Sequence, residues 1–148
     1  MSDMNDIGRD DTTEQEYIYF KEGLFGFETC RKFLPVLVEE KSDAVLTLHS
    51  LDREEISFVL MNPFYLLEEY DPQVSQQELA ELGEVEGAEY SWYVICTTRN
   101  PIEESTVNLK CPIVVNVHTR RARQVILEDK TYQFRHRLKD LRREADGC

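Results

Sequence analysis

The 148-residue chain has no apolar run that approaches the ~20 residues of a membrane-spanning helix. Its first sixteen residues carry six acidic side chains and one basic one, whereas a secretion signal begins with basic residues and continues into an apolar stretch. These absences predict a cytoplasmic protein that makes no membrane contact. The length is that of one domain, and a hydrophobic content of 41% is enough for one core.

The sequence also lacks the residue patterns of metal and catalytic sites. The histidines are scattered, and the cysteines stand far apart without a CxxC pair, at Cys30, Cys96, Cys111 and Cys148. Cysteines in apolar runs are expected to be small buried hydrophobic residues. No G-x-S-x-G elbow or glycine-rich phosphate loop is present. We therefore expect no metal, no other cofactor and no catalytic residue, so the chain is predicted not to be an enzyme.

Charge is unevenly distributed along the chain, whose net charge is −12. Residues 1–16 sum to −5 and residues 17–119 to −11, whereas residues 120–143 sum to +6 and the last five to −2. An acidic body repels nucleic-acid phosphates and attracts basic proteins. The alternative is that these acids serve only as a solubilising surface.

Short apolar runs, alternating or continuous, predict about eight strands and no alternation of strands with helices. One short helix is expected after Ser75, an N-cap with Glu78 three residues later, and Gly83 ends it. Gly23 and Gly26 bracket a tight turn whose Leu24 and Phe25 are expected to pack inward. This pattern predicts a mainly-β single domain, either a small barrel or a sandwich.

The two ends of the chain differ in composition from the middle. Phe134, Leu138 and Leu141 have the spacing of a C-terminal helix with basic residues between them. This helix would either dock on the domain or touch an acidic partner, or it is a solvated helix packed by those three residues. Charged residues with little to bury are expected to be disordered. The predicted regions are a disordered acidic N-terminus (1–16), a β domain (17–138) and a charged C-terminal tail (139–148).

A β-hairpin is predicted between Asn108 and Asp129. Two β-branched runs, residues 113–117 and 125–127, flank a polar and basic turn at residues 119–123. This segment has no spacing typical of a nucleophile or a metal cage. We interpret it as a surface for binding.

Four stretches of the chain resemble motifs of the FliW flagellar assembly factors, in the order of that family. Asn108-Leu109 and the run from Cys111 to Asn116 resemble "N-L-x-A-P-I-x-x-N". The others are QVIL from Gln124, YFKEGLFGFE from Tyr19 and NPF from Asn62. The sequence departs from the family at Lys21 and Cys111, at Asn62, and in residues 1–16, where the first strand of the family is poorly recognisable.

This resemblance implies a compact β-barrel-like fold with two protein partners. FliW-like proteins bind flagellin and CsrA, a small RNA-binding protein that represses translation of flagellin mRNA. The resemblance thus implies a flagellar assembly factor that antagonises this repression and does not bind nucleic acid itself. An acidic body suits a basic repressor, because complementary charge speeds encounter.

Candidate partner-binding residues come from the motif, from aromatic residues and from surface acids. The motif positions are Asn108, Pro112, Asn116 and Gln124. For Pro112 and Asn116 the alternative interpretation is a strand boundary and a solvent-facing position. Tyr65 is a candidate anchor, since binding energy concentrates in buried aromatics, and Glu103 with Glu104 are candidate rim charges.

A different function class is an RNA-binding β domain. Such a domain would use the basic hairpin turn, with Arg120, Arg121 and Arg123, together with the basic C-terminal segment. Against it, the net charge is strongly negative and no stacking aromatics are interleaved with these arginines.

Overall fold

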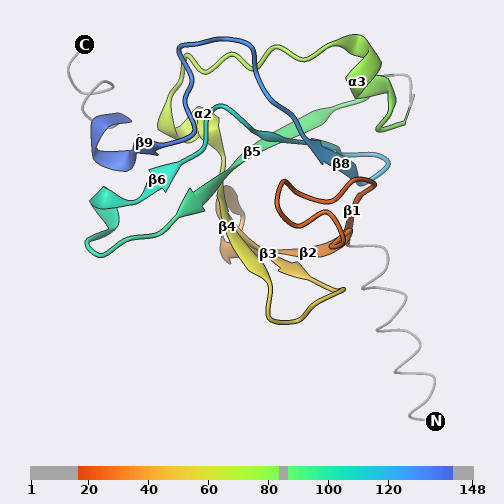
Figure 1. Cartoon of the computed structure of the whole chain (residues 1–148), viewed down its shortest axis with the longest axis horizontal. Helices are drawn as coiled ribbons and strands as arrows, with labels where there is room; N and C mark the ends of the chain where they lie inside the picture. Colours follow the sequence, from red (N-terminus) through yellow and green to blue (C-terminus); the bar gives the residue numbers. More distant parts are fainter. Residues whose placement is uncertain (1–16, 84–86, 142–148) are drawn as a thin grey trace.

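The computed structural model describes residues 17–83 and 87–141, which contain nine strands and a few short helices (Figure 1). The strands are β1 (Ile18–Phe20), β2 (Lys32–Glu39), β3 (Ser42–Ser50), β4 (Ser57–Met61), β5 (Tyr90–Thr97), β6 (Thr106–Val107), β7 (Ile113–Asn116), β8 (Arg121–Gln124) and β9 (His136–Arg137). The helices are α2 (Pro63–Leu66), α3 (Gln76–Ala80) and a 3-10 turn, η1 (Ile102–Glu104). The predicted mainly-β single domain is confirmed.

Seven of the strands close into a barrel. Their order is β4-β3-β2-β1-β8-β7-β5, and β5 pairs back with β4, while β6 and β9 extend the sheet beyond β5 (Figure 1). Every pairing is antiparallel except that of β1 with β8, which is parallel. Closure removes most sheet edges, and it decides between the two predicted architectures in favour of the barrel.

Two hydrophobic clusters form the core. The first fills the barrel and contains Phe20, Phe33, Leu48, Leu60 and Ile113, all of which are at most 1% exposed. The second lies outside it and includes Tyr70, Leu109 and Leu127. There the Tyr70 hydroxyl donates to the Leu109 carbonyl oxygen at 2.7 Å. Burial of that ring raises the pKa of Tyr70.

The hairpin exists, but the prediction of its turn and return strand was wrong. The return strand is β8, and Arg121 and Arg123 lie in it rather than in the turn. Arg120 takes a left-handed φ of 60° that closes the turn. In β8 the inward positions are Ala122 and Gln124, both buried. Buried and more exposed positions therefore alternate along β8, as expected of a strand. The inward residues are small or polar rather than large and apolar, so the sequence did not show the usual alternation of hydrophobic and polar residues.

The C-terminal segment also differs from its prediction. β9 pairs with β6, and helical conformation begins only at residue 138. Leu141 is buried, but Phe134 precedes β9 and is 60% exposed, so it is not part of a helical stripe. The predicted disordered region, residues 1–16, and the end of the tail, residues 142–148, lie outside the described residues.

Of the helices, α3 was predicted correctly. The Ser75 hydroxyl accepts the Glu78 N–H at 3.1 Å, as its capping role requires. The sequence did not predict α2. Its N-cap is Asn62, whose side-chain oxygen accepts the Phe64 N–H, and Pro63 follows at the first helical position.

Candidate partner-binding site

A groove beside β8 combines acidic and apolar side chains. It has a volume of about 360 Å³ and is lined by Glu22, Gly23, Phe25, Glu28, Glu78, Arg123, Gln124, Val125 and Ile126. We call it the acidic groove. Phe25 is 49% exposed and Ile126 is 61% exposed. Large hydrophobic side chains beside charges at a concave surface are typical of a protein-binding site.

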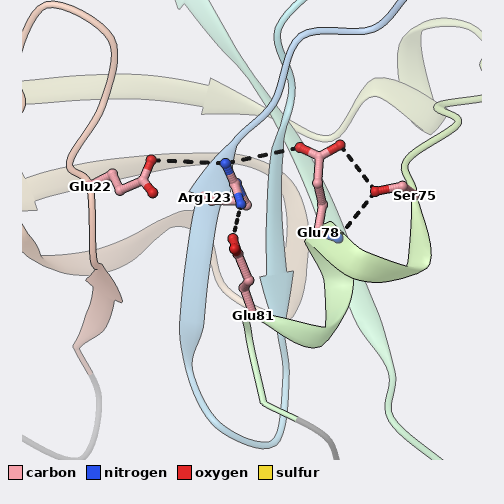
Figure 2. A network of polar contacts seen from close by, with 5 residues as sticks. All are labelled: Glu22, Ser75, Glu78, Glu81 and Arg123. Atoms are coloured by element: carbon pink, nitrogen blue, oxygen red, sulfur yellow. Dashed lines mark hydrogen bonds and ion pairs between the residues drawn. The ribbon is translucent and has the colours of Figure 1, made fainter.

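Arg123 lies at the centre of a cluster of carboxylates at this groove (Figure 2). One guanidinium nitrogen binds the Glu81 carboxylate, and another lies 3.9 Å from Glu22 and 4.0 Å from Glu78. The side chain of Arg123 is only 24% exposed, and its Nε is buried without a hydrogen-bond partner among the described residues. Because three carboxylates face one cation, the cluster keeps a net negative charge.

Gln124 positions the apolar wall of the acidic groove. Its side-chain oxygen accepts the Phe25 N–H at 3.0 Å, and its amide donates to the Cys111 carbonyl oxygen at 3.1 Å. The loop turns at Gly23, whose φ is +69°, and a Cβ there would lie 2.6 Å from the Glu28 Cα. Glycine is therefore required at position 23. The hydrogen bond to Gln124 fixes the backbone of Phe25, while the Phe25 ring faces solvent.

Asn116 positions the acidic wall. Its side-chain oxygen accepts the N–H groups of His118 and Thr119 at 2.9 and 3.1 Å, and its amide donates to the Gly83 carbonyl oxygen at 3.2 Å. The Thr119 hydroxyl donates to the Leu82 carbonyl oxygen. These bonds tie the β7–β8 turn to the segment that follows α3, the helix that carries Glu78.

The four motif residues predicted to contact partners are therefore largely enclosed. Asn116 is 0% and Gln124 is 6% exposed. Pro112 is buried, and Asn108 is half-buried with its side-chain oxygen accepting the Cys111 N–H at 2.9 Å. Their role as contacts stays a prediction, and their hydrogen bonds favour a positioning role instead.

The remaining candidates lie at the surface, away from the acidic groove lining. Tyr65 is 64% exposed, and Asp43 beside its hydroxyl raises its pKa. Glu103 is exposed. Glu104 pairs with Lys139 at 2.6 Å and Arg137 at 3.7 Å, and the Lys139 contact lowers its pKa. Tyr65 and Glu103 are thus accessible to a partner, whereas Glu104 already binds cations of this chain.

Sequence reasoning missed the residues that make the acidic groove. Phe25 was expected to pack inward, but only Leu24, at 1% exposure, does so. Between two glycines of positive φ the chain turns, and the neighbouring side chains point in different directions. The signal was present, since the stretch from Tyr19 that resembles the family motif also contains Glu22, Phe25 and Glu28.

Other kinds of site find little support in the described part of the chain. Residues 17–83 and 87–141 contain no group of three or more His, Cys, Asp or Glu side chains placed to hold a metal ion. Cys30, Cys96 and Cys111 are buried free thiols, and burial raises the pKa of Cys96. Within the same ranges no helix has the length and apolar content needed to span a membrane.

The comparisons with known proteins agree on one family. The FliW protein family model matches residues 2–138. The chain is 30% identical to the flagellar assembly factor FliW of Caldicellulosiruptor bescii, over 89% of this chain and 86% of that protein. It is 32% identical to that of Thermosipho africanus, over 90% and 92%. A crystal structure of the flagellar assembly factor FliW superposes with a TM-score of 0.76 at 32% identity, covering 84% of this chain and 86% of that one.

The closed barrel and these matches define the class, which is a small non-enzymatic protein that assists flagellum assembly. The chain belongs to the FliW family of flagellar assembly factors.

Proposed function

We propose that this chain acts in the cytoplasm by binding flagellin and the translational repressor CsrA, and so relieves repression of flagellin mRNA. The family resemblance supports both partners. The acidic groove and the carboxylate cluster around Arg123 support a basic partner in particular, because Glu22, Glu78 and Glu81 outnumber the single cation Arg123 among them. That excess of carboxylates beside exposed Phe25 and Ile126 carries the proposal.

In this arrangement the apolar residues supply affinity and the carboxylates supply steering. A basic side chain of CsrA would enter beside Glu22 and Glu78, while its apolar neighbours cover Phe25 and Ile126. Rim charges change the association rate more than the dissociation rate. Residues at the desolvated centre of an interface change the dissociation rate more than the association rate.

The surroundings of Arg123, Arg137 and Lys139 argue against the RNA-binding alternative. Arg123 is surrounded by carboxylates, and Arg137 and Lys139 bind Glu104. These cations would have to leave their carboxylates before they could neutralise phosphates, which is how most nucleic-acid affinity arises.

Titration calorimetry with CsrA of the same organism tests the proposal. We expect a one-to-one complex that is weakened about fivefold when Glu22 and Glu78 are both changed to Gln, because each exposed pair contributes about 0.5 kcal/mol. Changing Glu68 and Glu69 to Gln removes the same charge at exposed positions outside the acidic groove and should leave affinity unchanged. No heat at tens of micromolar CsrA would refute the proposed partner. Equal effects of the two variants would refute the site.

A further inference from the structure

Arg123 makes unequal contacts with the three carboxylates around it (Figure 2). One of its guanidinium nitrogens donates a close hydrogen bond to the Glu81 carboxylate. The other nitrogen lies 3.9 Å from Glu22 and 4.0 Å from Glu78, and both distances exceed that of a hydrogen bond. Arg123 is therefore bound closely by Glu81 and only loosely by the other two carboxylates.

Glu81 also differs from the other two in its position relative to the acidic groove. Glu22, Glu78 and Arg123 line the groove, whereas Glu81 does not. Glu81 is the C-cap of α3, about one helical turn after Glu78. The hydrogen bond to Glu81 thus holds the positive charge of Arg123 toward the end of α3, so the two groove carboxylates keep only weak contacts with this cation.

The groove carboxylates are open to a second cation. The side chains of Glu22 and Glu78 are 70% and 40% exposed, whereas that of Arg123 is 24% exposed. An ammonium or guanidinium group that enters the groove meets both carboxylates, but it also meets the like charge of Arg123, which repels it. Arg123 therefore lowers the affinity of the groove for a basic side chain, and it does so more strongly the closer it lies to Glu22 and Glu78.

We propose that Arg123 is an internal competitor for the carboxylates of the acidic groove, and that Glu81 is the positioning residue that limits this competition. The proposal rests on the proposed function, since it takes the groove as the site for a basic partner. The Arg123–Glu81 pair sets the affinity for the basic side chains of that partner and leaves the apolar wall of Phe25 and Ile126 unchanged.

A scaffolding role for Arg123 predicts the opposite sign. A cation that serves only to hold Glu22 and Glu78 in place raises the affinity for a partner, because without it the two carboxylates repel each other and separate. A competitor lowers that affinity. The direction in which partner binding changes when the charge of Arg123 is removed therefore distinguishes the two roles.

A capped synthetic peptide of alternating leucine and arginine serves as the probe, and NMR of the full chain reports its binding. Arg123→Gln should bind the peptide about fivefold more tightly, because Glu22 and Glu78 each become available for one exposed ion pair. Arg53→Gln is the matched control, since it breaks an exposed ion pair with Glu55 outside the groove. It removes the same charge and should leave the peptide affinity unchanged.

Glu81→Gln tests the positioning role. This variant should bind the peptide about twofold more weakly, because Arg123 is then released to pair with the groove carboxylates. Adding Glu81→Gln to Arg123→Gln should cause no further change, since Glu81 acts through Arg123. The side chain of Glu81 is 56% exposed, so its replacement leaves the core intact and tests the proposal even where Arg123→Gln does not fold.

The proposal would be overturned if Arg123→Gln bound the peptide equally or more weakly, or if Arg53→Gln strengthened binding as much. Unchanged binding by Glu81→Gln, or no amide shift in any form at millimolar peptide, would also overturn it. The same variants are titrated with CsrA. If CsrA bound none of them while the peptide followed the expected order, the proposed function would fail and this inference would stand. If CsrA bound but peptide affinity did not depend on Arg123, the reverse would hold.

Discussion

Replacing Asn116 with alanine tests whether this motif residue supports the acidic groove. Its side chain is 0% exposed and makes three hydrogen bonds, to the N–H groups of His118 and Thr119 and to the Gly83 carbonyl oxygen. Each such bond contributes about 0.5–1.5 kcal/mol, so the variant should lose about 2–4 kcal/mol of unfolding free energy. For a domain of this size that lowers the melting temperature by roughly 10 °C.

Urea unfolding measures the loss, and amide hydrogen exchange locates it at Thr119 and in α3. The matched control is His118→Ala in the same turn, because His118 is exposed and should change stability by less than about 0.5 kcal/mol. Below its melting temperature the folded Asn116→Ala variant should also bind CsrA more weakly. If the variant melted at the same temperature as the unaltered chain, with unchanged amide exchange at Thr119, the supporting role of Asn116 would be refuted. A direct contact of Asn116 with a partner, as the sequence predicted, would then be the better explanation.

Further predictions concern the second wall of the acidic groove, the outer core, the N-terminus and the charge. Gln124→Leu removes two hydrogen bonds, so it should cost about 1–3 kcal/mol and speed amide exchange at Phe25. Because burial raises the pKa of Tyr70 above its ordinary value, the stability from the neutral phenol should be complete below pH ~10 and decline above it. Tyr70→Phe should lower stability near neutral pH and lessen that alkaline decline, as pH-dependent urea unfolding would show. Deleting residues 1–11 should leave the melting temperature almost unchanged if they are disordered. Association with CsrA should slow as salt rises, since exposed charges are screened beyond ~8 Å at physiological ionic strength.

Local signals predicted the elements whose causes are local. Ser75 and Glu78 determine where α3 begins. Asn62, as N-cap, and Pro63 likewise begin α2, which the sequence did not predict. The return strand of the hairpin was misplaced because a closed barrel accepts Ala122 and Gln124 on its inner face. A polar side chain such as Gln124 is stable at an inward position because a neighbouring loop supplies its hydrogen-bond partner, here the Phe25 N–H.

The resemblance included Glu22, Phe25 and Glu28, but the assembly of the acidic groove could not be predicted, because its parts are distant in sequence. Glu22, Glu78 and Arg123 meet only once β1, α3 and β8 are in place (Figure 2). The resemblance named motif residues but did not reveal which of their side chains point outward. Asn116 and Gln124 make buried hydrogen bonds that support the acidic groove. Phe25 and Glu28, which belong to the motif that begins at Tyr19, line the groove.

The most direct test of the central claim is displacement of RNA from CsrA. Labelled flagellin mRNA leader is bound to CsrA of the same organism, and the chain is added while fluorescence anisotropy reports bound RNA. We predict that the unaltered chain releases the RNA and that the Glu22→Gln, Glu78→Gln variant needs about five times more protein, in line with its weaker pairing. The Glu68→Gln, Glu69→Gln variant should match the unaltered chain. RNA that stays on CsrA at tens of micromolar chain, or that binds the chain directly, would contradict the account.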